Sequence, residues 1–169
     1  MVQPAQAGKP DSQVMWIDHL SLLPGDSSVH TTFNSVNSGV GGGLCGLVIQ
    51  STTTGDTAPG GGNKEVWTAV EVPPGFKVIG VRICYENSNP RSYIDQTRLS
   101  QVQNPPSTAL VLLDDPTPLN HNGPICVDSQ PAPTAIDPPA GALLLSLRVK
   151  FDNTADMIVV RGVALHLRA

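Results

Sequence analysis

The sequence predicts an all-β fold, either a two-layer antiparallel β-sandwich or a jelly roll. Glycine and proline, 16 residues each, fall in clusters between apolar runs and therefore mark turns. Several of these runs alternate apolar and polar residues with a period of two, which is typical of strands. No segment keeps a helical period without an interrupting Gly or Pro. Many short strands at this spacing favour a sandwich or a jelly roll.

Nine strands are expected from alternation, β-branched residues and flanking turn residues. In the clearest one, the odd-numbered positions from Leu143 to Phe151 are all apolar, whereas Ser146, Arg148 and Lys150 lie between them. The expected strands are Val14–Leu23, Leu44–Ser51, Glu65–Val72, Phe76–Glu86, Tyr93–Val102, Thr108–Leu113, Pro124–Val127, Ala142–Phe151 and Met157–Leu167.

The first expected strand, Val14–Leu23, carries apolar residues on both of its faces, with Trp16 and Ile17 on opposite sides. A strand of this kind is covered on both sides in a folded protein. We therefore expect one of its faces to meet another subunit or a long loop.

Two segments of the chain resemble each other and predict a diverged internal repeat. Arg82 aligns with Arg148, and the residues around them match from a proline-rich start to an acidic-Asn turn. Chance similarity between amphipathic strands is the competing explanation. If the copies are related, each forms an antiparallel hairpin, one over residues 76–102 and the other over residues 142–167.

The repeat also predicts which way several side chains face. Cys84 is expected on the outer face of its strand, and Tyr85 and Phe151 on the core face. Asp95 and Arg161 fall at equivalent, nominally inward positions of the two copies. An isolated inward charge is costly, so we expect these two side chains to meet each other or to find other opposite charges. We assign Asp95, Arg161, Arg82 and Arg148 structural roles.

The domain organisation is expected to be simple, with a flexible segment over residues 1–13 and one β-sandwich domain over 14–169. The first residues contain no apolar signal region, which makes a cytoplasmic location the default expectation. Of the three cysteines, Cys84 and Cys126 form one disulfide, or all three stay reduced as in a cytoplasmic protein.

The charge balance excludes some classes of partner. The net charge is −4 and no run of Lys or Arg exists, so no nucleic-acid partner is expected. No apolar run is long enough for a membrane span, and no membrane partner is expected. Only 14% of the residues are charged, which leaves a weakly charged exterior that tolerates packing against a partner.

No catalytic or cofactor motif is convincing, and no cofactor is expected. The glycine pattern at 41–46 lacks the preceding strand and following helix of a dinucleotide site. The four histidines lack zinc-site spacing, although a catalytic triad can assemble from distant residues. Calcium takes oxygen ligands from loops, and its weak candidates also have ordinary turn explanations: Asp114, Asp115, Asp128, Asp152 and Asp156.

The best ligand-site candidate is Trp67, which lies between Glu65 and Glu71 on the face opposite a stripe of valines. An aromatic platform beside carboxylates is suited to sugars. In the alternative explanation, Trp67 is covered by the 52–63 loop or by another subunit.

Three functions are consistent with these observations. The first is a non-catalytic interaction or assembly module that forms a homo-oligomer, because sheet edges need cover and no reaction centre is visible. The alternative is a carbohydrate-binding, lectin-like sandwich that uses Trp67, Glu65 and Glu71. The second alternative is a hydrolase with a dispersed catalytic site.

Overall fold

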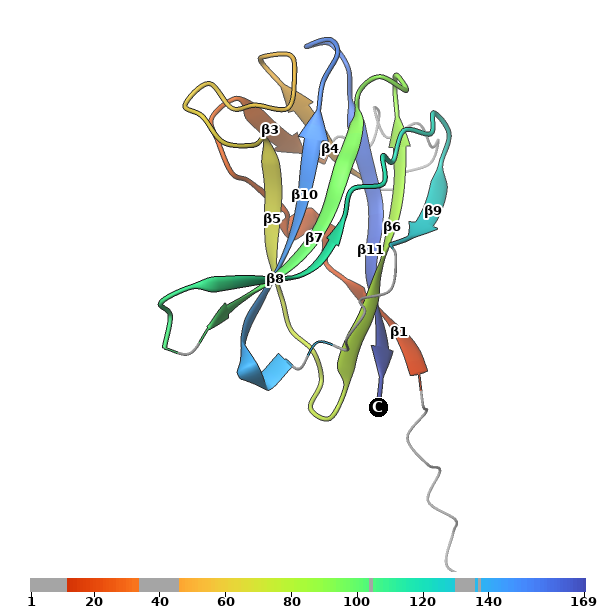
Figure 1. Cartoon of the computed structure of the whole chain (residues 1–169). Coiled ribbons are helices and arrows are strands. Elements are labelled where there is room, and N and C mark those ends of the chain that lie inside the picture. The colour runs from red at the N-terminus through yellow and green to blue at the C-terminus, as the bar shows by residue number, and fades with distance from the viewer. Residues whose placement is uncertain (1–11, 34–45, 104, 130–135, 137) are drawn as a thin grey trace, which may run out of the picture.

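The computed structural model describes residues 12–33, 46–103, 105–129, 136 and 138–169, and in this part the chain is a β-sandwich of two antiparallel sheets (Figure 1). This confirms the predicted fold class. The strands are β1 (Ser12–Ile17), β2 (Leu23–Pro24), β3 (Val29–Thr32), β4 (Leu47–Ser51), β5 (Glu65–Val70), β6 (Lys77–Asn87), β7 (Tyr93–Gln103), β8 (Ala109–Asp115), β9 (Ile125–Asp128), β10 (Gly141–Lys150) and β11 (Ile158–Arg168). Two short 3-10 helices in the same ranges, η1 (His19–Ser21) and η3 (Pro138–Ala140), lie between strands.

Over the described residues, one sheet has six strands and the other has five. The six-stranded sheet has the order β3-β4-β11-β6-β9, and β1 pairs with the same edge of β11 further along that strand. The five-stranded sheet has the order β2-β5-β10-β7-β8. Figure 1 shows β5, β10 and β7 in one layer and β11, β6 and β9 in the other.

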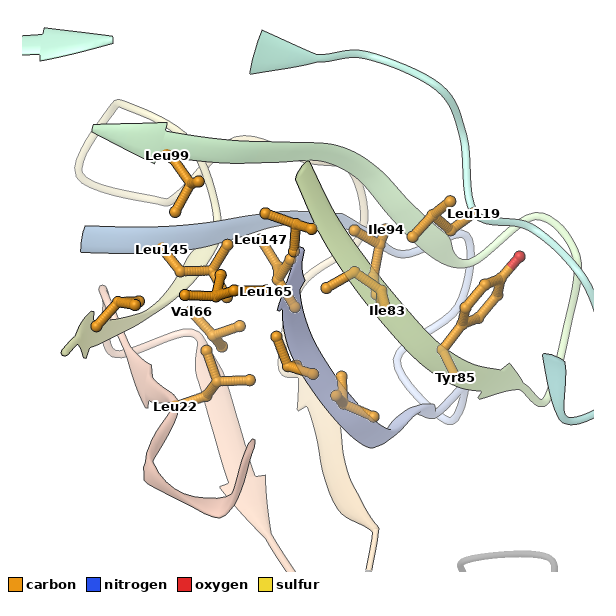
Figure 2. Close-up of a cluster of buried hydrophobic side chains, with 14 of the residues drawn as sticks. Leu22, Val66, Ile83, Tyr85, Ile94, Leu99, Leu119, Leu145, Leu147 and Leu165 are labelled. Atoms are coloured by element: carbon orange, nitrogen blue, oxygen red, sulfur yellow. The ribbon is translucent and has the colours of Figure 1, made fainter. Parts of the chain in front are cut away.

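The core lies between the two sheets and is built from their inward-facing Leu, Ile and Val side chains (Figure 2). Leu145 and Leu99 come from the five-stranded sheet, Leu165 comes from the six-stranded sheet, and all three are fully buried. Each such side chain stabilises the fold by about 1.5–3 kcal/mol relative to exposure. Tyr85 and Phe151 also lie in this core, as their expected faces predict.

The expected strand Val14–Leu23 is broken into two strands that belong to different sheets. The Asp18 carboxylate accepts a hydrogen bond from the N–H of Leu20 at 3.0 Å and caps the helix η1. A local side-chain hydrogen bond of this kind competes with strand pairing. Met15 and Ile17 pack against the core, while Val14 and Trp16 are 43% and 57% exposed, so the described residues cover that face of β1 only in part.

The predicted hairpins at residues 76–102 and 142–167 are wrong. β6 pairs with β11, and β7 pairs with β10, so each segment crosses from one sheet to the other. The first strand of each similar segment therefore pairs with the second strand of the other segment. Period-two alternation shows only which face of a strand is buried. It does not show which strand is the pairing partner, so a hairpin and a crossing between sheets give the same pattern.

Asp95 and Arg161 each sit at a register shift, where the bulged strand has one residue more than its partner. The two side chains do not meet. The Asp95 carboxylate lies 3.6 Å from Nε of Arg148, and the Arg161 guanidinium donates to Glu86. A bulge turns its extra residue away from regular alternation. The bulges therefore leave both charged side chains partly exposed, Asp95 at 17% and Arg161 at 14%.

Candidate functional site

The outer face of the five-stranded sheet carries one residue from each strand in a straight line. The cross-strand register places Leu23 beside Trp67, Trp67 beside Ser146, Ser146 beside Arg98, and Arg98 beside Asp114. We call these five residues the Trp67 row. Neighbouring strands lie about 4.8 Å apart, so about 14 Å separates the strand of Trp67 from that of Asp114.

The apolar half of the Trp67 row is open to solvent. Leu23 is 68% exposed and Trp67 is half-buried. A groove of about 530 Å³ runs past the indole between β2 and β10, and Ala69 and Leu144 extend its apolar wall. Gly25 permits this arrangement, because a Cβ there would lie only 3.3 Å from Nε1 of Trp67.

The polar half of the Trp67 row is held by hydrogen bonds. Asp114 accepts from Nε of Arg98 at 3.2 Å and from Nε2 of Gln96 at 2.6 Å. Ser146 lies between Trp67 and Arg98 and is 2% exposed, so it forms a low floor between two larger side chains. The row therefore joins an aromatic surface to fixed donors and acceptors, which is the general make-up of small-ligand sites.

The structure does not bring the two predicted glutamates to this groove. Glu65 is buried, and its carboxylate accepts from Nδ2 of Asn63 at 3.4 Å. Glu71 follows the end of β5 and lines a separate cavity of about 560 Å³ with Pro73 and Pro138. Segment β2, rather than the 52–63 loop, lies beside Trp67.

A second polar group on this face ties the 52–63 loop to the sheet. Arg148 donates to Asp56 of the loop and also faces Asp95 of the β7 bulge. Burial raises the pKa of Asp95, although Arg148 partly opposes this effect. Burial also tends to raise the pKa of Asp56, but Arg148 and hydrogen bonds outweigh it and the pKa is lowered.

Lys64 anchors the same loop from inside the fold. Its side chain has no exposed surface, and Nζ donates to the carbonyls of Thr53, Thr54 and Gly55 at 2.6, 2.8 and 3.1 Å. A buried ammonium needs such partners. This lysine was not among the residues predicted from the sequence, because nothing in the sequence marks a Lys beside a strand as buried.

The calcium candidates are engaged by protein groups. Asp114 binds Arg98 and Gln96, and Asp128 binds Arg82 and His166. The remaining candidates behave alike: Asp115 accepts from Thr117, Asp152 pairs with Arg91, and Asp156 accepts from Asn89 and Ser92. Within the described ranges, no group of three or more His, Cys, Asp and Glu residues could hold a metal ion.

Cys84 and Cys126 form a disulfide that joins β6 to β9 at directly paired positions. Cys84 lies on the outer face of its strand, as the repeat predicts, away from the core cluster. Disulfides persist in oxidising compartments, which does not favour the cytoplasmic default. None of the helices in the described ranges is long and apolar enough to cross a membrane.

No protein-family profile and no curated protein matches this sequence. Several solved structures are similar in fold, among them β-sandwich carbohydrate-binding modules. The CBM22-1–GH10 modules of xylanase 10B from Clostridium thermocellum, solved with xylohexaose, match at a TM-score of 0.55 and 9% identity over 90% of this chain. The match spans 27% of that chain.

The CBM36-1 domain of a multidomain xylanase from the hindgut metagenome of Trinervitermes trinervoides matches at a TM-score of 0.49 and 8% identity, over 91% of this chain and 95% of that domain. At identities this low, the likeness of these structures to the chain concerns the fold alone.

Proposed function

We propose that this chain is a non-catalytic carbohydrate-binding module and that its glycan lies across the strands along the Trp67 row. The observation that carries this proposal is the row itself. It sets a half-buried indole, a low serine floor and a hydrogen-bonded Arg98–Asp114 pair side by side on one open sheet face.

The chemistry of a sugar ring suits this order of residues. One face of a pyranose presents C–H groups, which pack on an aromatic ring as other apolar groups do. The hydroxyls at its edge need donors and acceptors, and Arg98, Asp114 and Gln96 supply both kinds. These side chains already bond to one another, so little side-chain entropy is lost when a ligand binds.

The similar solved structures support the choice of probe. The CBM22-1–GH10 structure, which matches this fold over 27% of its own chain, was solved with xylohexaose. Xylo-oligosaccharides are therefore the first ligands to test, followed by a panel of other β-linked glucans and galactans. Carbohydrate binding replaces the assembly module as the leading function, and the homo-oligomer stays a prediction that light scattering can test.

Titration calorimetry with xylohexaose and the panel tests the proposal. Trp67→Ala is expected to weaken binding about tenfold or more, as loss of a central aromatic contact does at binding sites. Arg98→Met should weaken it less, because Gln96 still holds Asp114. Phe33→Ala is the matched control: Phe33 is 64% exposed and lies outside the row.

Two results would overturn the proposal. One is that the unmodified protein binds no glycan on the panel. The other is that Trp67→Ala and Phe33→Ala bind as tightly as the unmodified protein. Thermal unfolding of each variant separates a lost contact from a lost fold.

A further inference from the structure

The outer face of the six-stranded sheet carries a second line of residues with the same order of side-chain types. The register places Trp16 of β1 beside Ala164, Ala164 beside Arg82, and Arg82 beside Asp128 of β9. We call these four residues the Trp16 row. The two rows thus read Trp, small residue, Arg, Asp across successive strands, on opposite outer faces of the sandwich.

The contacts within the Trp16 row also match those of the first row. Asp128 accepts from Nε of Arg82 at 2.7 Å and from Nε2 of His166 at 2.9 Å. His166 is therefore the second side-chain donor to Asp128, as Gln96 is to Asp114. The small residue is again covered by its larger neighbours, since Ala164 has no exposed surface.

Each indole is also seated against a glycine. A Cβ on Gly162 would lie 2.9 Å from Cζ3 of Trp16, so only glycine lets the ring approach the sheet this closely. Gly25 follows β2, on the other side of Trp67 from Ser146, and a Cβ there would lie 3.3 Å from Nε1 of that indole.

A role in core packing does not account for the Trp16 row. Trp16 is 57% exposed, and Val14 on the same face is 43% exposed. A hollow of about 460 Å³ on this face is lined by Val14, Gly80, Asp128 and His166 among others. An exposed aromatic side chain on the same face as an open hollow and a fixed ion pair has the parts that a ligand site needs.

Asp128 of the Trp16 row is a carboxylate at neutral pH. Hydrogen bonding from Arg82 outweighs burial and, with His166, lowers the pKa of Asp128 to about 2. Because Asp128 is then a carboxylate that can only accept, Nε2 of His166 carries the proton of the hydrogen bond between them. The Trp16 row therefore offers donors and acceptors beside an aromatic face, as the Trp67 row does.

We propose that the Trp16 row is a second glycan-binding surface, so that one domain binds two glycan chains on its opposite faces. This inference rests on the proposed carbohydrate-binding function and extends it to the other sheet. The two sheets are packed back to back, with a spacing of about 10 Å, and their outer faces point apart (Figure 1). A single short oligosaccharide cannot reach both rows, so the domain should cross-link polysaccharide chains.

The stoichiometry of binding tests this inference. Titration calorimetry with a short oligosaccharide that binds the unmodified protein should give two sites per chain. Trp67→Ala and Trp16→Ala should each give one site, and the double variant none. Phe33→Ala should keep both sites. Arg82→Met is a second variant for the same row, with thermal unfolding as the check that each protein is folded.

Polysaccharide cross-linking gives an independent readout. The unmodified protein should increase the light scattering of a soluble xylan, whereas either single Trp variant should not. One site in the unmodified protein, with Trp16→Ala unchanged, would overturn the second surface and leave the first intact. Absence of binding at either row would remove the proposed function as well. A Trp16-dependent dimer in sedimentation without glycan would assign this face to a second copy of the chain and overturn the inference.

Discussion

The two outer faces of this sandwich carry the same order of side chains but support it in different ways. On the five-stranded sheet, Trp67 is half-buried beside β2, and Lys64 and Arg148 hold the 52–63 loop to the same sheet. On the six-stranded sheet, Trp16 is largely exposed, and the disulfide lies two positions along from the Arg82–Asp128 pair. The two sheets therefore differ in what stabilises them near the rows: a loop held by a buried lysine in one sheet, and a covalent cross-link in the other.

The largest difference between the faces should follow removal of the disulfide by a Cys84→Ser/Cys126→Ser double substitution. The bond closes a loop with a sequence separation of 42 residues, which corresponds to about 4 kcal/mol in the chain-entropy account. Urea unfolding measures this loss. Glycan affinity at the Trp16 row should fall more than affinity at the Trp67 row, because the disulfide joins the strands of Arg82 and Asp128. Equal losses of affinity at both rows would contradict this local role of the disulfide.

Lys64→Met should act on the opposite face. The substitution removes a fully buried ammonium and its three hydrogen bonds to backbone carbonyls. Because hydrogen bonds from a charged donor are stronger than neutral ones, we expect a loss of about 2–4 kcal/mol in the free energy of unfolding. The matched control is Lys77→Met, since Lys77 is exposed and should change stability by less than about 0.5 kcal/mol. Equal effects of the two substitutions would contradict the anchoring role of Lys64.

Arg148→Met should cost more than Asp95→Asn, because Arg148 serves two carboxylates and Asp95 only one cation. We expect about 2 kcal/mol for the first change and below about 1 kcal/mol for the second, less than a fully buried pair would lose. Urea unfolding of the two variants gives both values, and a larger loss for Asp95→Asn would reverse the assigned roles.

The pH dependence of stability gives a further check on Asp95. Its pKa is raised in the folded state, so its protonation favours folding at acid pH, and this contribution is lost as the pH rises through the folded pKa. Asp95→Asn should therefore be most costly relative to the unmodified protein at acid pH. A difference that instead grows toward neutral pH would contradict this assignment.

A further small effect is expected for Gly162→Ala. The added methyl group would displace the Trp16 indole and cost about 1 kcal/mol, with weaker glycan binding at the Trp16 row only. Gly60→Ala is the control, because a Cβ there would have no neighbour within 4 Å and Gly60 lies outside both rows. Fluorescence of a Trp67→Phe background reports on Trp16 alone, and equal spectra for the two glycine variants would count against a seated indole.

Much of this architecture was accessible from the sequence because burial leaves a pattern along the chain. Alternation predicted the sandwich, and the internal repeat predicted the faces of Cys84, Tyr85 and Phe151. Strand pairing leaves no such pattern, which is why the two similar segments were expected as hairpins and why the bulges at Asp95 and Arg161 were not foreseen.

The site shows the same limit more sharply. Trp67 could be predicted as a site residue from a single strand, because the alternation of its neighbours in the sequence puts it on the face opposite the valines. Arg98 and Asp114 share a row with Trp67 only through the register of three further strands. Glu65 and Glu71 are near Trp67 in the sequence, yet one is buried and the other belongs to a different cavity. The contribution of a residue to a sheet surface thus depends on pairing across strands as much as on alternation along them.

The most direct test of glycan binding uses the fact that the chain contains two tryptophans, one in each row. In a protein labelled with 15N-tryptophan, each indole N–H gives its own NMR signal, which Trp16→Phe and Trp67→Phe assign. We predict that both signals shift and saturate as a binding oligosaccharide is added. If the Trp67 signal stays in place while the ligand binds, the proposed site is contradicted.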